Sequence, residues 1–235
     1  MLYRYVKAPP VSPRRRASRR VSFGLMGLGG IILAWVAWPI LSFSLASGDL
    51  FSQTVTPIAE SKNLSPVVFA AGDPGIADFT NANAWFPTAP QKKVVTAVNS
   101  YTISIPKLKI VDAEVLIGGD DLSKSLIHYG GTGLPGEYGN TVIFGHSTLP
   151  QFFNPKSYKT IFSTLPTLEE GDQIDVTYDG ISYTYIVYEL TVSDPSDLSA
   201  LEQRFDDSYL TLITCVPPGT YWQRLHVKAK LERPL

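Results

Sequence analysis

The chain has 235 residues, of which 44% are hydrophobic and 17% charged, so it can build a packed core and is neither disordered throughout nor two large domains. Its net charge of −1 hides a division: residues 1–46 hold seven basic and no acidic residues, and the remainder holds 13 basic and 21 acidic ones, a net charge of −8. The acidic body excludes nucleic acid as the main partner, and a single cysteine excludes an internal disulfide and paired-cysteine zinc sites.

An uncharged run covers residues 23–46 and follows a cluster of arginines. At about 1.5 Å per helical residue it is long enough to cross a hydrocarbon core of about 30 Å. We therefore predict a transmembrane helix at 23–46, with residues 1–22 cytoplasmic and the body outside by the positive-inside rule. A cleavable signal peptide and a twin-arginine export signal are less favoured alternatives, because the apolar run exceeds the usual core of about 7 to 15 residues.

Residues 47–99 mix Ser, Pro, Ala, Asn and Thr with scattered apolar residues and keep neither helical nor strand periodicity. This composition predicts an extracytoplasmic stalk or linker. Phe79, Trp85 and Phe86 are large for a pure linker. They suggest that part of this segment packs on the following domain or covers its site.

From residue 100 to 235 the pattern changes to short runs of β-branched and aromatic residues between Gly, Pro and Asp, which predicts a mostly β domain. A barrel or a sandwich is the natural closure for so many strands. Seven or eight strands are expected. The seven that the pattern places are Tyr101–Ile105, Val111–Ile117, Thr141–Gly145, Gln173–Tyr178, Ile181–Thr191, Tyr209–Thr214 and Arg224–Leu231.

Asp179-Gly180, between two alternating runs, predicts a tight hairpin because these residues tolerate positive φ. Short helical stretches are expected at Leu122–Leu126, Tyr158–Leu165 and Leu198–Phe205, the last one capped by Ser196 or Asp197.

Cys215 follows the predicted strand at 209–214, and the next residues include Pro217 and Pro218, which cannot continue a ladder. If the strand that begins at Arg224 pairs with it as a hairpin, Cys215 and Arg224 face each other. Alternation places Arg224 on the face that points away from the core, with the opposite face formed by Leu225, Val227, Ala229 and Leu231. Taken singly, a free Cys is often a buried hydrophobe and an outward Arg is usually solvated.

His146 also stands where an apolar strand becomes a polar loop, after Gly145. A thiol nucleophile needs a neighbouring group that takes and returns protons, and imidazole is the usual choice. The other two histidines suit this role less, since His128 lies in a Gly-rich turn and His226 alternates outward on a strand, so we expect structural or surface roles for both. Threonine is common at strand ends, so Thr214 is left out of the predicted site.

The run TLITC at 211–215, followed nine positions later by Arg224 in QRLHV, resembles the signature of the sortase family. The stretch HYGGTGLPGEYGNTVIFGHS at 128–147 is similar to the segment that carries the sortase histidine. The three residues follow the order found in sortases: His, then Cys, then Arg. The basic cluster, anchor and stalk also match the usual sortase layout. Papain-like and NlpC/P60-like peptidases resemble it less because their Cys precedes their His, and the SxGC context of L,D-transpeptidases is absent.

The resemblance implies an all-β fold, a closed eight-stranded sortase-like barrel over residues 100–235, with a few short helices. It implies that Cys215 attacks the threonine carbonyl of a C-terminal LPxTG-type sorting motif and forms a thioester. His146 would then act as acid and base, and Arg224 would stabilise the oxyanion or hold the substrate backbone. The partners implied are sorting-motif proteins and an amine acceptor, either a cell-wall precursor or a pilin lysine.

Two other functions stay open: an anchored barrel that binds a partner while its Cys is inert, and a thiol peptidase that only hydrolyses. No cofactor or metal is predicted. The acidic residues near the Cys strand are read as a solvated loop and helix face, although their pattern leaves a calcium requirement undecided: Asp194, Asp197, Glu202, Asp206 and Asp207. The sortase subclass is not assigned.

Overall fold

The computed structural model describes residues 13–46, 80–86, 89–94 and 96–233. One long helix, α1 (Pro13–Ala46), precedes a domain of eight strands. The strands are β1 (Ser100–Ile105), β2 (Ile110–Ile117), β3 (Leu126–His128), β4 (Gly139–Phe144), β5 (Gln173–Tyr178), β6 (Ile181–Ser193), β7 (Ser208–Val216) and β8 (Gln223–Leu231). Short 3-10 helices connect them: η1 (Ala82–Ala84), η2 (Pro106–Leu108), η3 (Pro150–Phe152), η4 (Leu165–Thr167) and η5 (Ser199–Leu201).

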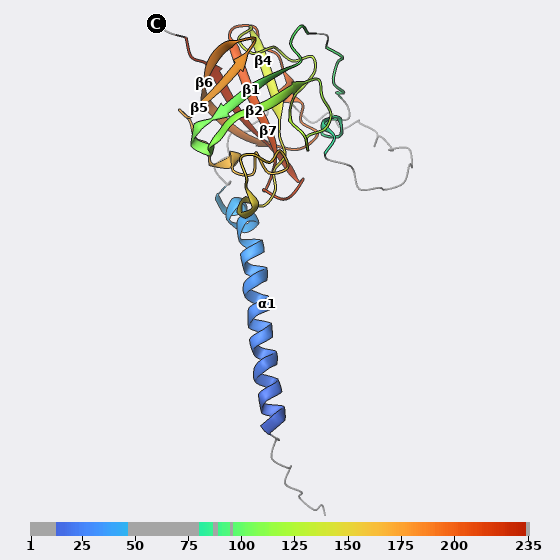
Figure 1. Ribbon diagram of the computed structural model, residues 1–235, viewed down its shortest axis with the longest axis vertical. Helices are drawn as coiled ribbons and strands as arrows, with labels where there is room; N and C mark the ends of the chain where they lie inside the picture. Colours follow the sequence, from blue (N-terminus) through green and yellow to red (C-terminus); the bar gives the residue numbers. More distant parts are fainter. Residues whose placement is uncertain (1–12, 47–79, 87–88, 95, 234–235) are drawn as a thin grey trace, which may run out of the picture.

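The eight strands close into one barrel in the order β1-β2-β3-β4-β7-β8-β6-β5 (Figure 1). Two neighbouring pairs are parallel, β2 with β3 and β4 with β7, and the other pairs are antiparallel. Closure leaves no free sheet edge, which removes the unpaired backbone groups that an open sheet exposes. The predicted closed eight-stranded barrel is confirmed.

Alternate side chains of every strand point into the barrel and fill it with aliphatic and aromatic groups. We call these buried side chains the inner cluster; on β7 and β8 they include Leu210, Leu212, Leu225, Val227 and Ala229. The predicted inward face of the last strand is therefore confirmed. The tight hairpin is confirmed as well, because Tyr178 pairs with Ile181 and both turn residues, Asp179 and Gly180, have positive φ.

β3 was not among the predicted strands, and the predicted helices were wrong in type or extent. Leu122–Leu126 forms turns and then enters β3, and Tyr158–Leu165 is a series of turns that ends in η4. Leu198–Phe205 contains only the single turn of η5. The predicted cap by Ser196 or Asp197 is wrong, because the N-cap of η5 is Leu198; the Asp197 carboxylate instead accepts a hydrogen bond of 2.9 Å from the Ser199 N–H in the turn before it.

The N-terminal helix begins earlier than the predicted span at 23–46. Within α1, the stretch Ser18–Phe43 is long and apolar enough to cross a membrane, and its side chains are largely exposed. Figure 1 shows α1 as a rod that meets the barrel only at its C-terminal end. This arrangement is compatible with a membrane anchor.

Candidate active site

The β7–β8 hairpin brings Cys215 and Arg224 directly opposite each other, as alternation predicted. Their neighbours on the two strands, Val216 and Leu225, belong to the inner cluster, so Cys215 and Arg224 project from the outer surface of the barrel. Neither side chain is solvated, however, since each is only 1% exposed. Arg224 therefore points away from the core as predicted, but it is not solvated, because other parts of the chain cover this face.

His146 reaches the same place from β4, which runs parallel to β7. Backbone and side-chain hydrogen bonds extend the contact past the strand end: the Gly145 N–H donates to the Ile213 carbonyl at 3.1 Å, and the Ser147 hydroxyl donates to the Cys215 carbonyl at 2.6 Å. His146 lies between these two bonded residues, at the level of Cys215. The structure thus brings all three predicted site residues together.

Gly145 makes this approach possible. A Cβ at this position would lie 2.3 Å from a ring carbon of Phe162 and 2.6 Å from a methyl of Leu126, closer than van der Waals contact allows. The Phe162 N–H in turn donates to the His146 carbonyl at 3.0 Å. The loop that follows β4 is therefore packed tightly enough to fix the histidine backbone beside β7.

Trp85 packs against Arg224 and His146 and belongs to the same buried cluster as Cys215. Its ring lies 5.0 Å from the guanidinium carbon of Arg224, contacts the His146 ring edge-on at a centroid distance of 6.2 Å, and stacks on Phe144 at 5.4 Å. A cation over an aromatic face is attracted by the ring quadrupole, so Trp85 partly replaces the water that Arg224 has lost. The buried side chains on this outer surface form the outer cluster: Ala82, Trp85, Phe86, Leu122, Ile127, Tyr129, Val142, Phe144, Ala200, Ile213 and Cys215.

Residues 80–86, which we call the cover segment, hold Trp85 in place. The Ala82 N–H donates to the Asp120 carbonyl at 2.8 Å, and the Leu122 N–H donates to the Thr80 carbonyl at 2.8 Å. The cover segment is therefore fastened by a few backbone bonds to the loop between β2 and β3, and it is not a strand of the barrel. The suggestion that the residues before 100 pack over the site agrees with Trp85 and Phe86, whereas Phe79 lies outside the described residues.

Burial sets the electrostatics of the site. It raises the pKa of the Cys215 thiol to about 11, and the nearby Arg224 charge offsets part of this rise. The same burial lowers the pKa of Arg224, although a guanidinium stays charged in proteins. In the described part of the chain no carboxylate forms an ion pair with Arg224, and its Nε makes no hydrogen bond. A buried cation with an unused donor is suited to bind an oxygen that carries negative charge.

The other two histidines have structural surroundings. His128 is buried inside the barrel, where its Nδ1 lies 2.9 Å from the Tyr101 hydroxyl. His226 points outward but is also buried, with its Nε2 3.3 Å from the Ser193 hydroxyl. Thr214 uses its hydroxyl to donate to the Gly145 carbonyl at 2.8 Å, which positions the histidine loop. The geometry agrees with the expected structural or surface roles of His128 and His226, and of the two roles His226 has the structural one because its side chain is 1% exposed.

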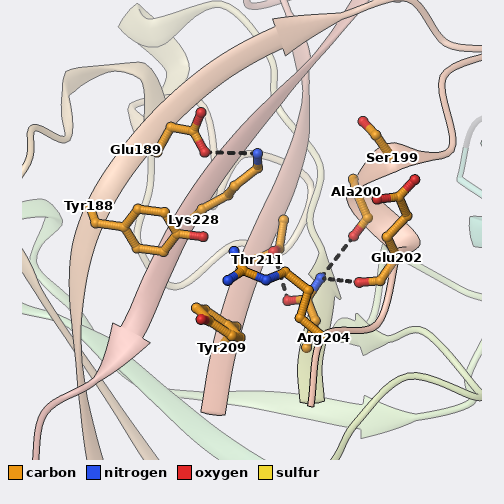
Figure 2. A pocket seen from close by; sticks show the side chains of 10 residues that line it. Tyr188, Glu189, Ser199, Ala200, Glu202, Arg204, Tyr209, Thr211 and Lys228 are labelled. Carbon is orange, nitrogen blue, oxygen red and sulfur yellow. Dashed lines mark hydrogen bonds and ion pairs between the residues drawn. The ribbon is translucent and has the colours of Figure 1, made fainter. Parts of the chain in front are cut away.

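The outer surface continues from Cys215 to a polar hollow of about 270 Å³ (Figure 2). Thr211 in its lining lies four residues before Cys215 on the same face of β7, roughly 13 Å away at about 3.3 Å per residue. A bulge in β6 turns both Tyr188 and Glu189 outward, and Glu189 pairs with Lys228 at 2.8 Å.

The acidic residues near β7 are engaged in ordinary surface contacts. Asp206 pairs with Arg204 at 2.7 Å, and Asp207 pairs with both Lys230 and Arg233 at 2.8 Å. Among the described residues no group of three His, Cys, Asp or Glu side chains is arranged to hold a metal ion. These contacts fit the solvated reading of the acidic residues.

Comparison with known proteins identifies relatives of this domain. A family model for the sortase domain matches residues 103–232. Sortase D of Bacillus subtilis (strain 168) is 30% identical over 129 residues, 53% of this chain and 58% of that protein, so the match spans less than two thirds of the relative.

Two solved structures are also similar. One is a sortase D5 transpeptidase from Clostridium perfringens, with 28% identity, 60% of this chain and 83% of that one covered, and a TM-score of 0.50. The other is sortase C-1 from Actinomyces oris, with 29% identity, coverages of 59% and 76%, and a TM-score of 0.52.

Proposed function

This chain belongs to the sortase family, and from that premise we propose that it is a membrane-anchored cysteine transpeptidase that cleaves a C-terminal sorting motif and transfers the acyl group to an amine. The observation that carries the proposal is that Cys215 on β7, Arg224 on β8 and His146 in the loop after β4 come together beside Trp85. A thiol, a proton carrier and a fixed cation are the groups that acyl transfer requires.

In the first half of the reaction, the Cys215 thiolate attacks the threonine carbonyl carbon of an LPxTG-like motif, and the carbonyl oxygen becomes an oxyanion. Arg224 stabilises this oxyanion or holds the substrate backbone. The C–N bond then breaks, the departing amine takes a proton from His146, and a thioester remains on Cys215.

In the second half, an incoming amine attacks the thioester carbonyl and gives its proton to His146. The new amide bond forms, the C–S bond breaks, and the thiolate is regenerated. The acceptor we propose is the amine of a cell-wall precursor or of a pilin lysine. If water replaces the amine, the products are those of the hydrolytic alternative.

The closed site must open before this chemistry begins. With the sulfur 1% exposed and its pKa raised to about 11, the thiolate is a minor species while Trp85 covers it. We propose that substrate binding displaces the cover segment, admits water and the peptide, and lowers the thiol pKa toward its ordinary value.

The burial of the sulfur also supports the second candidate, a binding module with an inert cysteine. The deciding experiment incubates the full chain with a sorting-motif peptide and an amine, and detects the products by mass spectrometry. The proposal expects an amide to the added amine, a thioester of the peptide on Cys215, and neither in Cys215→Ala. Hydrolysed peptide alone would favour the peptidase, and no reaction would favour the binding module.

The proposed location follows from α1. We propose that α1 spans the cell membrane once, with residues 1–22 in the cytoplasm and the barrel outside, because the basic residues cluster on the N-terminal side of the apolar stretch. Protease added to intact cells should then digest the barrel and leave an N-terminal fragment protected.

A further inference from the structure

If α1 spans a membrane, its length determines how close the barrel lies to the bilayer. The apolar part begins after Arg20, and the 19 residues from Val21 to Pro39 measure roughly 28 Å at about 1.5 Å each, close to the thickness of a hydrocarbon core. The last turns of α1, from Pro39 onward, then lie in the outer headgroup region.

These last turns contact the end of the barrel at which β7 finishes. Phe43 packs against the inner cluster, and with Pro39 and Ser42 it lines an apolar cavity of about 280 Å³. The opposite wall of the cavity comes from the loop after β4 and the β7–β8 loop, through residues that include Pro150 and Pro218. Figure 1 shows the same end of the barrel resting on α1.

The two loops that form this wall touch each other and carry large exposed aromatic side chains. A Cβ at Gly219 would lie 3.0 Å from the Leu149 side chain, so the loops are in contact. Phe152 is 59% exposed, Tyr221 48% and Trp222 65%. These three exposed aromatic residues lie on adjoining loops, and tryptophan and tyrosine are the residues that favour the boundary between water and lipid.

We propose that this end of the barrel, the membrane-side face formed by Pro150, Phe152, Pro218, Tyr221 and Trp222, inserts its aromatic rings into the outer interface of the bilayer that α1 spans. The partner is a phospholipid surface, and the inference rests on the proposed anchor. The face is continuous with the end of α1, which holds it at the depth of the headgroups.

The consequence concerns the active site. Cys215 precedes Pro218 by three residues and Arg224 follows Trp222 by two, so both lie beside the membrane-side face. The reacting sulfur then sits close to the lipid surface. Substrates and acceptors that are tethered to the same membrane reach it by lateral diffusion.

The test measures the depth of single labels on the full chain in phosphatidylcholine and phosphatidylglycerol vesicles. Cys215→Ala removes the native thiol, and an environment-sensitive fluorophore is then attached to Phe152→Cys or Trp222→Cys. Matched controls are Tyr138→Cys and Ile181→Cys, which are 56% and 55% exposed at the opposite end of the barrel. A quencher attached to the lipid chains reports contact with the bilayer, and flotation of the vesicles reports anchoring separately.

We expect the labels at 152 and 222 to be blue-shifted and quenched at least about twofold more than the two control labels. A chain that floats while all four labels behave alike overturns this proposal and leaves the anchor intact. A blue shift at 152 and 222 without lipid quenching means that protein covers the face, which also overturns it. A chain that does not float overturns the anchor together with this inference. None of these readouts depends on catalysis, so they are independent of the transpeptidase proposal.

Discussion

The inner and outer clusters are both buried, but they are closed in different ways. The inner cluster lies inside the barrel, so opening it requires breaking the hydrogen bonds between strands. The outer cluster lies on the surface of the same strands and is closed by the cover segment and the loop between β6 and β7. The difference teaches that burial serves stability in the inner cluster, whereas beside the outer cluster it keeps water from the thiol and the arginine that we propose as catalytic groups.

The largest expected difference between the clusters comes from removing one buried side chain in each. Cys215→Ala should reduce transpeptidation by at least about 10⁴-fold and change the free energy of unfolding little, because only one sulfur is lost. Leu212→Ala, three residues away and fully buried in the inner cluster, should destabilise by about 2 to 5 kcal/mol. Peptide turnover and urea unfolding in detergent measure both effects. Equal losses of stability would contradict the distinction.

A second prediction concerns the charge of Arg224, which is buried beside the outer cluster. Arg224→Lys keeps the charge but loses the planar group that lies over Trp85, so kcat/KM should fall by about 10²-fold. The matched control is Arg233→Lys, because Arg233 also lies over an aromatic ring, that of Tyr138, but on the surface. The control should stay within about twofold of the unchanged protein. Similar losses in both variants would mean that Arg224 has no special role at the site.

The sequence predicted these positions well wherever the information was local. Alternation along β8 and the prolines after Cys215 were sufficient to place Cys215 opposite Arg224, and the end of an apolar strand at Gly145 located His146. Both rules depend only on neighbouring residues, and the barrel pairs the strands as those rules require.

What covers the site was hard to predict because it depends on distant residues. Alternation assigned Arg224 to the outer face but carried no information on Trp85, which is 139 positions away and packs over it. β3 was missed because Leu126–His128 is too short to show alternation. The stretch 158–165 has helix-like spacing, but it folds as a series of turns and ends in η4, whose second residue is Pro166.

The third prediction asks how easily the cover segment opens. Trp85→Ala should increase the rate at which a methanethiosulfonate reagent labels Cys215 at pH 8 by about tenfold or more. Burial raises the pKa of this thiol to about 11, so exposing it lowers the pKa and increases the thiolate fraction at pH 8. Phe205→Ala, which removes a ring that is 71% exposed, is the control and should leave the rate unchanged. An unchanged rate in Trp85→Ala would mean that another barrier limits access to the sulfur.

The smallest predicted effect is a change in how stability depends on pH. It comes from two buried histidines, one on each side of the barrel wall. Burial lowers the pKa of both His128 and His226 to about 4, below the ordinary value of about 6.5. Below pH 6.5 the unfolded chain therefore binds protons that the folded chain does not. Each histidine contributes stability that is present above pH 6.5 and is lost as the pH falls toward 4, about 3 kcal/mol for complete exclusion of the proton.

The two histidines should differ in how this stability is lost. His128 lies inside the barrel and can be protonated only when the barrel opens, whereas His226 lies on the outer face and can take up a proton when the covering loop moves. Urea unfolding at pH 7 and 4.5 should therefore show that His128→Gln flattens the pH dependence more than His226→Gln does. If both substitutions flatten it equally, the loop between β6 and β7 protects His226 as well as the barrel wall protects His128, and the two sides of the wall would not differ in how easily they open.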